Sequence, residues 1–533
     1  MTTIRQPAVT VNKLPAVLPA ALEEQKVLIV GQMLSTGSAT TGIIETNIVE
    51  TEIDAKFGQK SMVAEQLRQS FTILKESGSA RIPRIDVLPF SDAGGSAAAQ
   101  GIISITEKGG STAAATVGGT LNVIIGSAQQ YTIPYNISVG DSFTAIVAGV
   151  TAAINSTTCP VTAAVGSVTV TNIEIDFNNA GTVGNFIGLG FSGTINDGTD
   201  EVLGNVLVAV TGFASGSGDP ATADINTALD LIVERYQTIC APSQWAVADI
   251  KTFLNTRFNV DNEILDGVCI THKIDTASNL ATYATTTNNS NAVVVLGDED
   301  QTTSKYAGPL YREFDFCQSC HLGVIRALRR TNGANLIRYV INGQTFDLQG
   351  GPELASLPYH NTPLYNINVA NSSLGFSKTE VVTLNTAGVT LIGNNISNAL
   401  VLLGTTVTTY KTNAQGQADA TWHFLNTVDT VSVAAEYIFN SFKRDYVQTR
   451  LTTGNLRAGR GVANAESILA SMKQYYLELA DLMIVRDSKT DIKFFMESIL
   501  LDIDLVTGAA VIGANLPIVV QLRSIVASLI TTF

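Results

Sequence analysis

The sequence GFSKTEVVTLNTAGV (residues 375–389) opens the region around which the rest of the chain is organised, and this region runs to Phe533. It continues with ATWHFLNTVD (residues 420–429) and closes with the apolar segment LPIVVQLRSIV (residues 516–526). Between the last two segments, apolar side chains at helical spacing predict an amphipathic helix: Ile468, Leu469, Met472, Tyr476, Leu479 and Leu482. Gly508 and Gly513 then punctuate two strand-like runs, which predicts a hairpin that ends at the C-terminus.

These segments, in this order and spacing, resemble the tail sheath proteins of contractile-tailed phages, in the Mu-like branch. The resemblance is closer after residue 375 and looser before it. It implies a subunit that polymerises as stacked hexameric rings around an inner tube. The partners it implies are further copies of the chain, the tail tube protein, and the baseplate and tail terminator proteins. The place it implies is a virion tail assembled in the host cytoplasm.

Composition bounds the class of protein. A chain of 533 residues is too long for one core and predicts about two to four domains. Only 15% of its residues are charged, which suits large protein–protein contacts or, equally, a large β-rich core in a monomer. The net charge of −14, without a dense Lys/Arg run, argues against nucleic-acid binding. Charge-poor windows are broken by Asn, Thr and Gly, so we expect no membrane insertion.

The first half of the chain predicts an arm and an α/β layer. Residues 1–20 hold three prolines and predict an extended N-terminal arm. Residues 21–99 and 214–374 predict one discontinuous α/β domain, because a strand (residues 26–31), a helix (residues 61–77) and a second strand (residues 84–90) follow one another. A helical stripe from Ile225 to Tyr236 resumes the pattern later.

Residues 100–213 predict an inserted β-rich domain. Between Gly109 and Asn172 the only charged residue is Asp141. Short runs at residues 121–125 and 166–171 predict strands, and residues 141–153 predict a helix. Gly-rich stretches at both ends are typical of domain joints. The C-terminal sheath-like domain then spans residues 375–516, and a linking strand spans residues 517–533.

Motifs that could carry chemistry have ordinary structural explanations. Cys317, Cys320 and His321 match the C-x-x-C-H pattern of haem attachment, but the N-terminus lacks the apolar core of an export signal, and a zinc site would need more ligands. We interpret the two cysteines as structural, and the five cysteines of the chain as reduced thiols. The sequence GQMLSTGS (residues 31–38) lacks the lysine and spacing of a phosphate loop. We therefore expect no catalytic residue, metal or cofactor, and no enzyme.

Two sets of residues are candidate contact sites. A basic cluster could be a solvated face or a contact to an acidic partner, and the resemblance implies that it faces the tail tube: Lys443, Arg444, Arg450, Arg457 and Arg460. The resemblance also implies that the terminal segments link subunits by strand exchange, through Val9, Val11, Leu14, Ile518, Val520, Leu522, Ile525 and Val526.

The sequence thus predicts a mixed α+β and α/β multidomain fold, and the resemblance implies that its terminal strands are exchanged between subunits. The function that the resemblance implies is a contractile tail sheath that drives its tube through the host envelope. Two alternatives stay open: a β-rich surface binding or adhesion module, and the sheath of a phage-derived contractile bacteriocin or secretion device.

Overall fold

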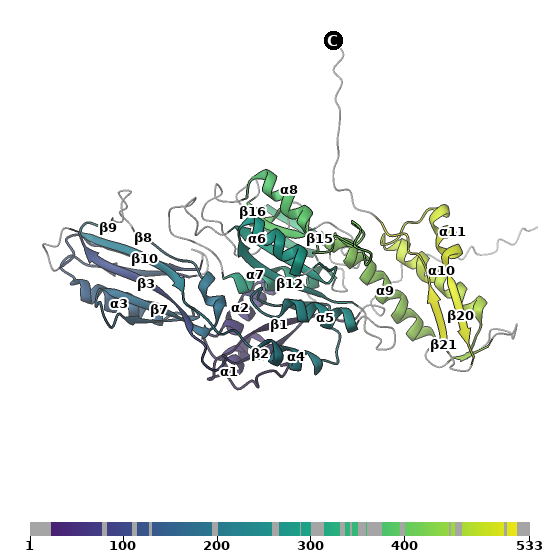
Figure 1. The fold of residues 1–533 in the computed structure, drawn as a ribbon, viewed down its shortest axis with the longest axis horizontal. Helices are drawn as coiled ribbons and strands as arrows, with labels where there is room; N and C mark the ends of the chain where they lie inside the picture. Colours follow the sequence, from purple (N-terminus) through teal and green to yellow (C-terminus); the bar gives the residue numbers. More distant parts are fainter. Residues whose placement is uncertain are drawn as a thin grey trace, which may run out of the picture.

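A computed structural model of the chain shows three units in a row (Figure 1). The inserted unit (residues 98–214) lies at one end, the α/β unit (residues 23–97 and 215–424) in the middle, and the C-terminal unit (residues 425–519) at the other end. The structure describes residues 23–76, 83–108, 114–126, 131–193, 201–257, 266–287, 289–299, 314–330, 336–341, 344–349, 359, 376–394, 400–403, 405–446, 449–452, 461–505 and 509–519.

The α/β unit is built on a seven-stranded sheet in which every neighbouring pair is parallel except β16–β17. Its central strands are buried on both faces, which explains their almost continuous apolar runs. In spatial order they are β17 (Leu400–Leu403), β16 (Val389–Asn394), β13 (Val293–Glu299), β12 (Val268–Asp275), β11 (Thr238–Cys240), β1 (Lys26–Gln32) and β2 (Arg84–Phe90).

Helices cover both faces of this sheet. Val27 and Ile29 of β1 belong to the hydrophobic core that includes α2 (Met62–Glu76) and α7 (Asp315–Arg330). Leu28 and Val30 point to the opposite face, because side chains alternate along a strand. That face is covered by α4 (Thr222–Asp230), α5 (Val247–Arg257), α6 (Ala277–Thr282) and α8 (Lys378–Ala387). The predicted strand–helix–strand unit is confirmed.

Two features of the α/β unit differ from the sequence predictions. The helix predicted between Ile225 and Tyr236 ends at Asp230, and Leu231 and Val233 are exposed beyond it. The sheet also continues past residue 375, because β16 pairs in parallel with β13.

Helix α8 begins with a capping box in which Ser377 and Glu380 bind each other's backbone. Shorter elements are η1 (Glu50–Glu52), α1 (Ile53–Phe57), η4 (Tyr283–Thr287), β14 (Leu336–Ile341) and β15 (Gln344–Gln349).

The inserted unit contains two antiparallel sheets and the helix α3 (Phe143–Asn155). One sheet has the order β6 (Val161–Val165), β7 (Asn172–Ala180), β3 (Ala98–Glu107), β10 (Val206–Ala214) and β9 (Glu201–Leu203). The other has the order β5 (Tyr131–Ile137), β4 (Gly119–Ile125) and β8 (Leu189–Gly193), and the helical turn η2 (Thr182–Phe186) precedes β8.

The strand predicted at residues 166–171 is wrong. These residues connect β6 to β7, and the Gly166 amide closes the loop on the Asn172 carbonyl at 2.8 Å. The valine-rich run mimics a strand, but Val168 is 93% exposed and lies outside the ladder.

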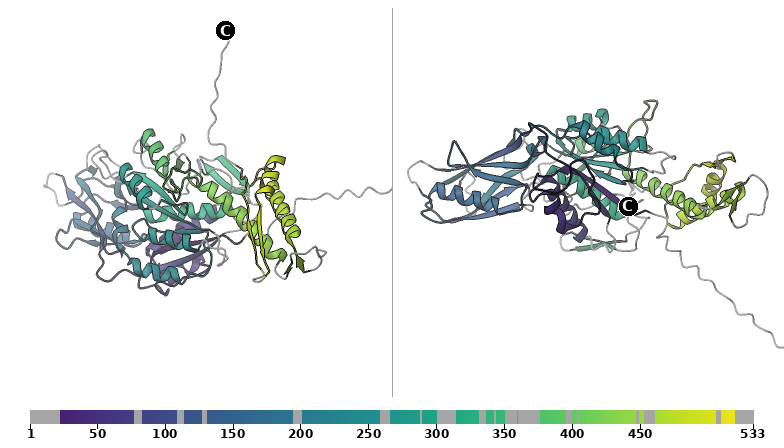
Figure 2. Two further views of the ribbon diagram at one scale, coloured as in Figure 1. Left: turned by 45° about the vertical axis from the view of Figure 1, so that its right-hand side comes forward. Right: turned by 90° about the horizontal axis from the view of Figure 1, so that it is seen from below.

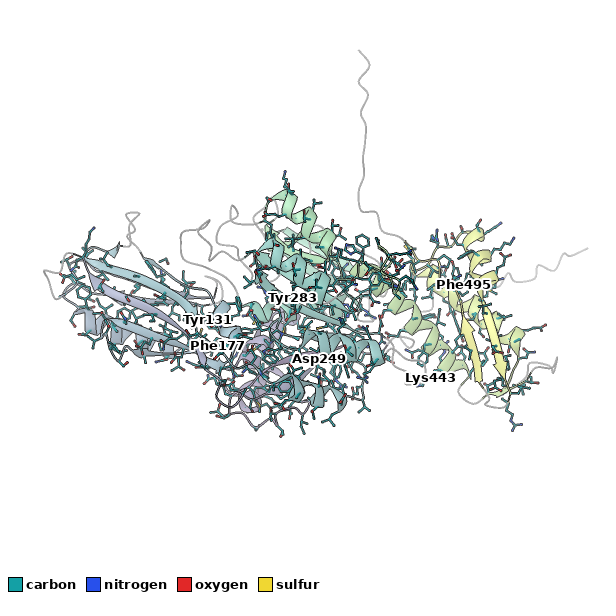
Figure 3. The ribbon with its side chains drawn as sticks, in the orientation of Figure 1. Tyr131, Phe177, Asp249, Tyr283, Lys443 and Phe495 are labelled. Atoms are coloured by element: carbon teal, nitrogen blue, oxygen red, sulfur yellow. The ribbon has the colours of Figure 1, made fainter. Side chains whose placement is uncertain are left out.

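The inserted unit is joined firmly to the α/β unit: Tyr131 donates to the buried Glu65 of α2 at 2.8 Å, and Phe177 lies against Phe316 (Figure 3).

The C-terminal unit is a layer of three helices with a β-hairpin. Its elements are α9 (Leu425–Tyr446), α10 (Ala465–Asp481), α11 (Lys489–Ser498), β20 (Leu500–Asp504) and β21 (Ala509–Gly513), with the short strands β18 (Arg450–Leu451) and β19 (Val462–Ala463). The predicted helix with Ile468 and Leu479 is therefore confirmed as α10. Figure 2 shows α9 leading out of the α/β unit into this unit. Among the described residues, no helix is both long and apolar enough to cross a bilayer.

Candidate assembly site

The helices of the C-terminal unit are held by tyrosines that fill its core. Helices α9 and α10 run antiparallel, since Tyr437 donates to Glu478 at 2.5 Å and Tyr475 donates to Asp445 at 2.7 Å. Tyr476 stacks on Phe495 of α11, with ring centroids 4.4 Å apart. These contacts give the unit a hydrophobic core separate from those of the α/β unit.

The hairpin covers only part of this helix layer. In the described residues β20 pairs only with β21, so the outer edge of each strand is open. Leu500 and Val511 lie on its outward face and are 76% and 67% exposed. A two-stranded sheet with open edges is marginal by itself and is a template for further strands.

An apolar groove of about 630 Å³ lies between β21 and α9. We call it the α9 groove. Six α9 side chains line it at helical spacing and are only half-buried: Val431, Ala435, Ile438, Phe439, Phe442 and Tyr446. The opposite wall comes from Ala510 and Ile512 of β21 and from Leu516. Its shape and lining suit an extended apolar segment, because a strand added to the edge of β21 would lie over the helix layer.

A smaller pocket of about 300 Å³ lies against the same helix on the side of the α/β unit. Val431 and Ala435 line both hollows, so one stripe of α9 faces the pocket and the groove. Trp422 and Asp266 contribute to the pocket from the α/β unit. The hollow surface therefore follows α9 along most of its length.

Both ends of the described chain lie at α9 or beside the groove. The Glu23 amide donates to Glu436 of α9 at 2.6 Å. At the other end, Leu516 lines the groove and the segment after it pairs with residues 484–486: Val519 donates to the Ile484 carbonyl at 3.0 Å, and Arg486 donates to the Pro517 carbonyl at 2.9 Å.

A buried ionic network fixes α9 to the α/β unit. Arg326 of α7 donates to Asp429 of α9, with Nη2 2.6 Å from Oδ1, and Tyr359 donates to the other carboxylate oxygen at 2.6 Å. Arg330 lies between Asp429 and Glu436, at 3.6 and 3.8 Å. All five side chains are buried. Charges buried this deeply are tolerated only when they are paired and hydrogen-bonded.

The network continues to residues that lie just before β11 and β12. Arg235 binds Glu436 at 2.7 Å and Asp266 at 3.0 Å, and Ser432 donates to Asp266 at 2.6 Å. Burial opposes the charged form of Asp266, but Arg235 and Arg330 outweigh it and lower the pKa of that carboxyl. Burial also lowers the pKa of Arg330, with the adjacent Arg326 acting in the same direction.

The predicted strand-exchange residues are mostly outside the described residues. Ile518 is described and lies half-buried opposite Val485. The others are Val9, Val11, Leu14, Val520, Leu522, Ile525 and Val526, so strand exchange stays a prediction.

Three of the five predicted tube-facing residues lie at or just beyond the C-terminal end of α9. Lys443 and Arg444 are exposed in its last turn, where Figure 3 labels Lys443, and Arg450 is exposed on the following strand. Arg444 also pairs with Asp445 at 2.7 Å. Arg457 and Arg460 lie outside the described residues.

The C-x-x-C-H motif lies on α7 in the protein core. Cys317 and Cys320 belong to different hydrophobic clusters, and all five cysteines are free and buried. His321 is fully buried, and burial lowers its pKa to about 4. Within the described ranges no group of three or more His, Cys, Asp or Glu side chains is placed to hold a metal. The motif is thus part of the packing of α7 against the sheet.

The carboxyl end of β1, where the strand order reverses and open α/β sheets bind ligands, is filled by side chains. Gln32 is fully buried there and donates to Asp92 at 2.9 Å and to the Ala180 carbonyl of the inserted unit at 2.7 Å. Gly31 has no side chain because a Cβ would lie 2.2 Å from the Gln66 side chain. The loop that resembles a phosphate loop is packed against α1, where the Leu34 amide donates to the Phe57 carbonyl and the Ser38 amide to the Ala55 carbonyl, both at 3.0 Å.

Comparison with known proteins finds likeness only among solved structures. No protein-family model matches the chain, and no curated protein sequence matches it. The sheath tail protein of Desulfitobacterium hafniense is similar at 11% identity and a TM-score of 0.42, over 94% of this chain and 98% of that one.

Two further similar chains come from the anti-feeding prophage. One, in the sixfold-symmetrised baseplate, has 9% identity and a TM-score of 0.42 over 100% of both chains. The other, in the contracted baseplate, has 12% identity and a TM-score of 0.38 over 99% of both. These chains are what the protein is similar to, and the Mu-like branch stays a prediction. These identities assign no role to any residue.

Sequence reasoning missed the network that joins α7 to α9. Asp429 and Glu436 lie seven positions apart, and so on one face of a helix that is otherwise rich in apolar residues. Arg326 and Arg330 lie four apart on α7. The available signal was therefore two acidic residues at helical spacing on one helix and two basic residues at helical spacing on another. Charged side chains are almost never fully buried unless they are paired.

Proposed function

We propose that this chain is the structural subunit of a contractile tail sheath, which polymerises as stacked hexameric rings around a tail tube and contracts to drive that tube through an envelope. The observation that carries the proposal is the α9 groove beside a hairpin with open edges. The order of the sheath-like segments after residue 375 supports it independently.

In this proposal, terminal strands of neighbouring subunits complete the sheet of the C-terminal unit. A strand next to β21 would cover the half-buried stripe of α9, and its backbone would pair with the open edge. Because such pairing needs few particular side chains, it can persist while the attached units rotate. The network of Arg326 and Asp429 would carry that rotation from the α/β unit into α9.

The basic residues at the end of α9 are the proposed contact to the tube. Lys443, Arg444 and Arg450 project from the C-terminal unit in a chain that is acidic as a whole. An acidic tube surface would fix register and orientation through them rather than supply most of the affinity. A phage tail and a phage-derived contractile device would use the same contacts.

Two truncations test the linking strands. Variants lacking residues 1–20 or 520–533 should remain folded by circular dichroism, because both cuts leave the described hydrogen bonds of Glu23 and Val519 intact. Neither variant should form tubes under conditions in which the full chain does. Long tubes from either truncation would refute the linking role of that segment. A full chain that forms no tubes would refute the sheath.

A further inference from the structure

We propose that in the free subunit the α9 groove is occupied by the chain's own C-terminal tail, residues 520–533, and that assembly replaces it with the tail of a neighbour. Occupation of the groove by the chain's own tail is a property of the isolated monomer. Only its replacement by a neighbour's tail rests on the proposed sheath function.

The tail begins at the rim of the groove. Leu516 is one of the lining residues, Pro517 is buried, and Val519 is held to Ile484 by its amide. The anchored residues 517–519 therefore deliver residue 520 to the same unit that carries the groove. A tethered segment has an effective concentration in the millimolar range, far above that of any neighbour in dilute solution.

The length of the tail suits the groove. From Val431 to Tyr446 the helical stripe spans about 23 Å, at 1.5 Å per residue. Residues 520–533 reach up to about 46 Å when extended. The tail can therefore turn back at Val519 and still cover the whole stripe.

The sequence of the tail also suits the α9 groove. Val520 and Leu522 alternate with Gln521 and Arg523, which is the pattern of a strand with one buried and one solvated face. The groove offers apolar contacts from Ile438, Phe442 and Met472. Without an occupant, this concave surface would be an adhesive patch on every free subunit. Exchange of an identical segment between copies is a low-cost route from monomer to polymer.

The experiment measures thiol reactivity in the full chain. Leu522→Cys places a thiol on the proposed buried face, and Gln521→Cys places one on the solvated face next to it. The five native cysteines are buried and report unfolding if they react. In the monomeric fraction, Leu522→Cys should react with a maleimide at least about tenfold more slowly than Gln521→Cys. Adding Ile438→Asp in the groove should remove this protection, with the native thiols still unreactive.

The protection must not depend on protein concentration, because the contact lies within one chain. Equal reaction rates of Leu522→Cys and Gln521→Cys in the monomer would overturn the proposal. So would protection that survives Ile438→Asp, or protection that arises only at concentrations where oligomers form. Failure of the sheath proposal is separate: it would leave a protected Leu522→Cys thiol in a chain that never forms tubes.

Discussion

The guanidinium of Arg326 on α7 donates to the carboxylate of Asp429 on α9, with Nη2 2.6 Å from Oδ1 and neither side chain exposed. Tyr359 binds the other oxygen of the same carboxylate, and the Arg329 guanidinium lies 3.9 Å from the centre of the Tyr359 ring. The start of α9 is therefore fixed to the α/β unit, while its last turns belong to the core of the C-terminal unit. One helix connects the two units.

Removing the Asp429 carboxylate should lower the stability of the folded chain. Asp429→Ala leaves Arg326 buried without its main partner, which we expect to lower the free energy of unfolding by about 3–5 kcal/mol. Urea denaturation followed by circular dichroism measures this loss. Glu497→Ala, which breaks the exposed pair of Lys493 and Glu497, is the matched control and should stay within about 0.5 kcal/mol. Equal effects of the two substitutions would contradict a structural role for the network.

The buried His321 should make stability depend on pH. Burial lowers its pKa to about 4, against about 6.5 when the chain is unfolded. Because the folded pKa is the lower one, this stability is present above pH 6.5 and is lost as the pH falls towards 4, to a total of about 3 kcal/mol. His321→Leu removes this titration, so its unfolding free energy should fall less over that range. Parallel pH profiles of wild type and variant would show that His321 is not the titrating group.

A charge in the α9 groove should block assembly more than it destabilises the monomer. Ile438 is half-buried and lines the groove, so Ile438→Asp should cost the monomer about 1 kcal/mol. The monomer avoids burying the new carboxylate by releasing its own tail, whereas a neighbour's tail in the groove would bury it. We therefore expect the concentration needed for assembly to rise at least about tenfold. Thr490→Asp adds the same charge at the exposed first turn of α11 and should leave assembly unchanged. Light scattering against protein concentration compares the two.

Among the elements around the site, a periodic pattern in the sequence located α10 but not α9. The stripe from Ile468 to Leu479 predicted α10 because one apolar face of that helix packs in the core. The mixed α/β multidomain architecture that these patterns predicted is confirmed. The valines near Val168 misled because strand-forming residues here occupy a loop, which the Gly166 amide closes on the Asn172 carbonyl and in which Val168 is exposed.

The site itself was harder to predict, because it depends on what the hairpin leaves uncovered. Ile438 and Phe442 have the spacing of ordinary core residues, and only the position of β21 shows that they line an open groove. The pairing of Arg326 with Asp429 links residues 103 positions apart, and charge alone does not reveal which distant partner a buried arginine has.

The most direct test of the sheath proposal is negative-stain electron microscopy of the purified full-length protein at high concentration. The account predicts hollow, striated tubes of stacked rings. Uniform small particles that never form tubes at any concentration would contradict it.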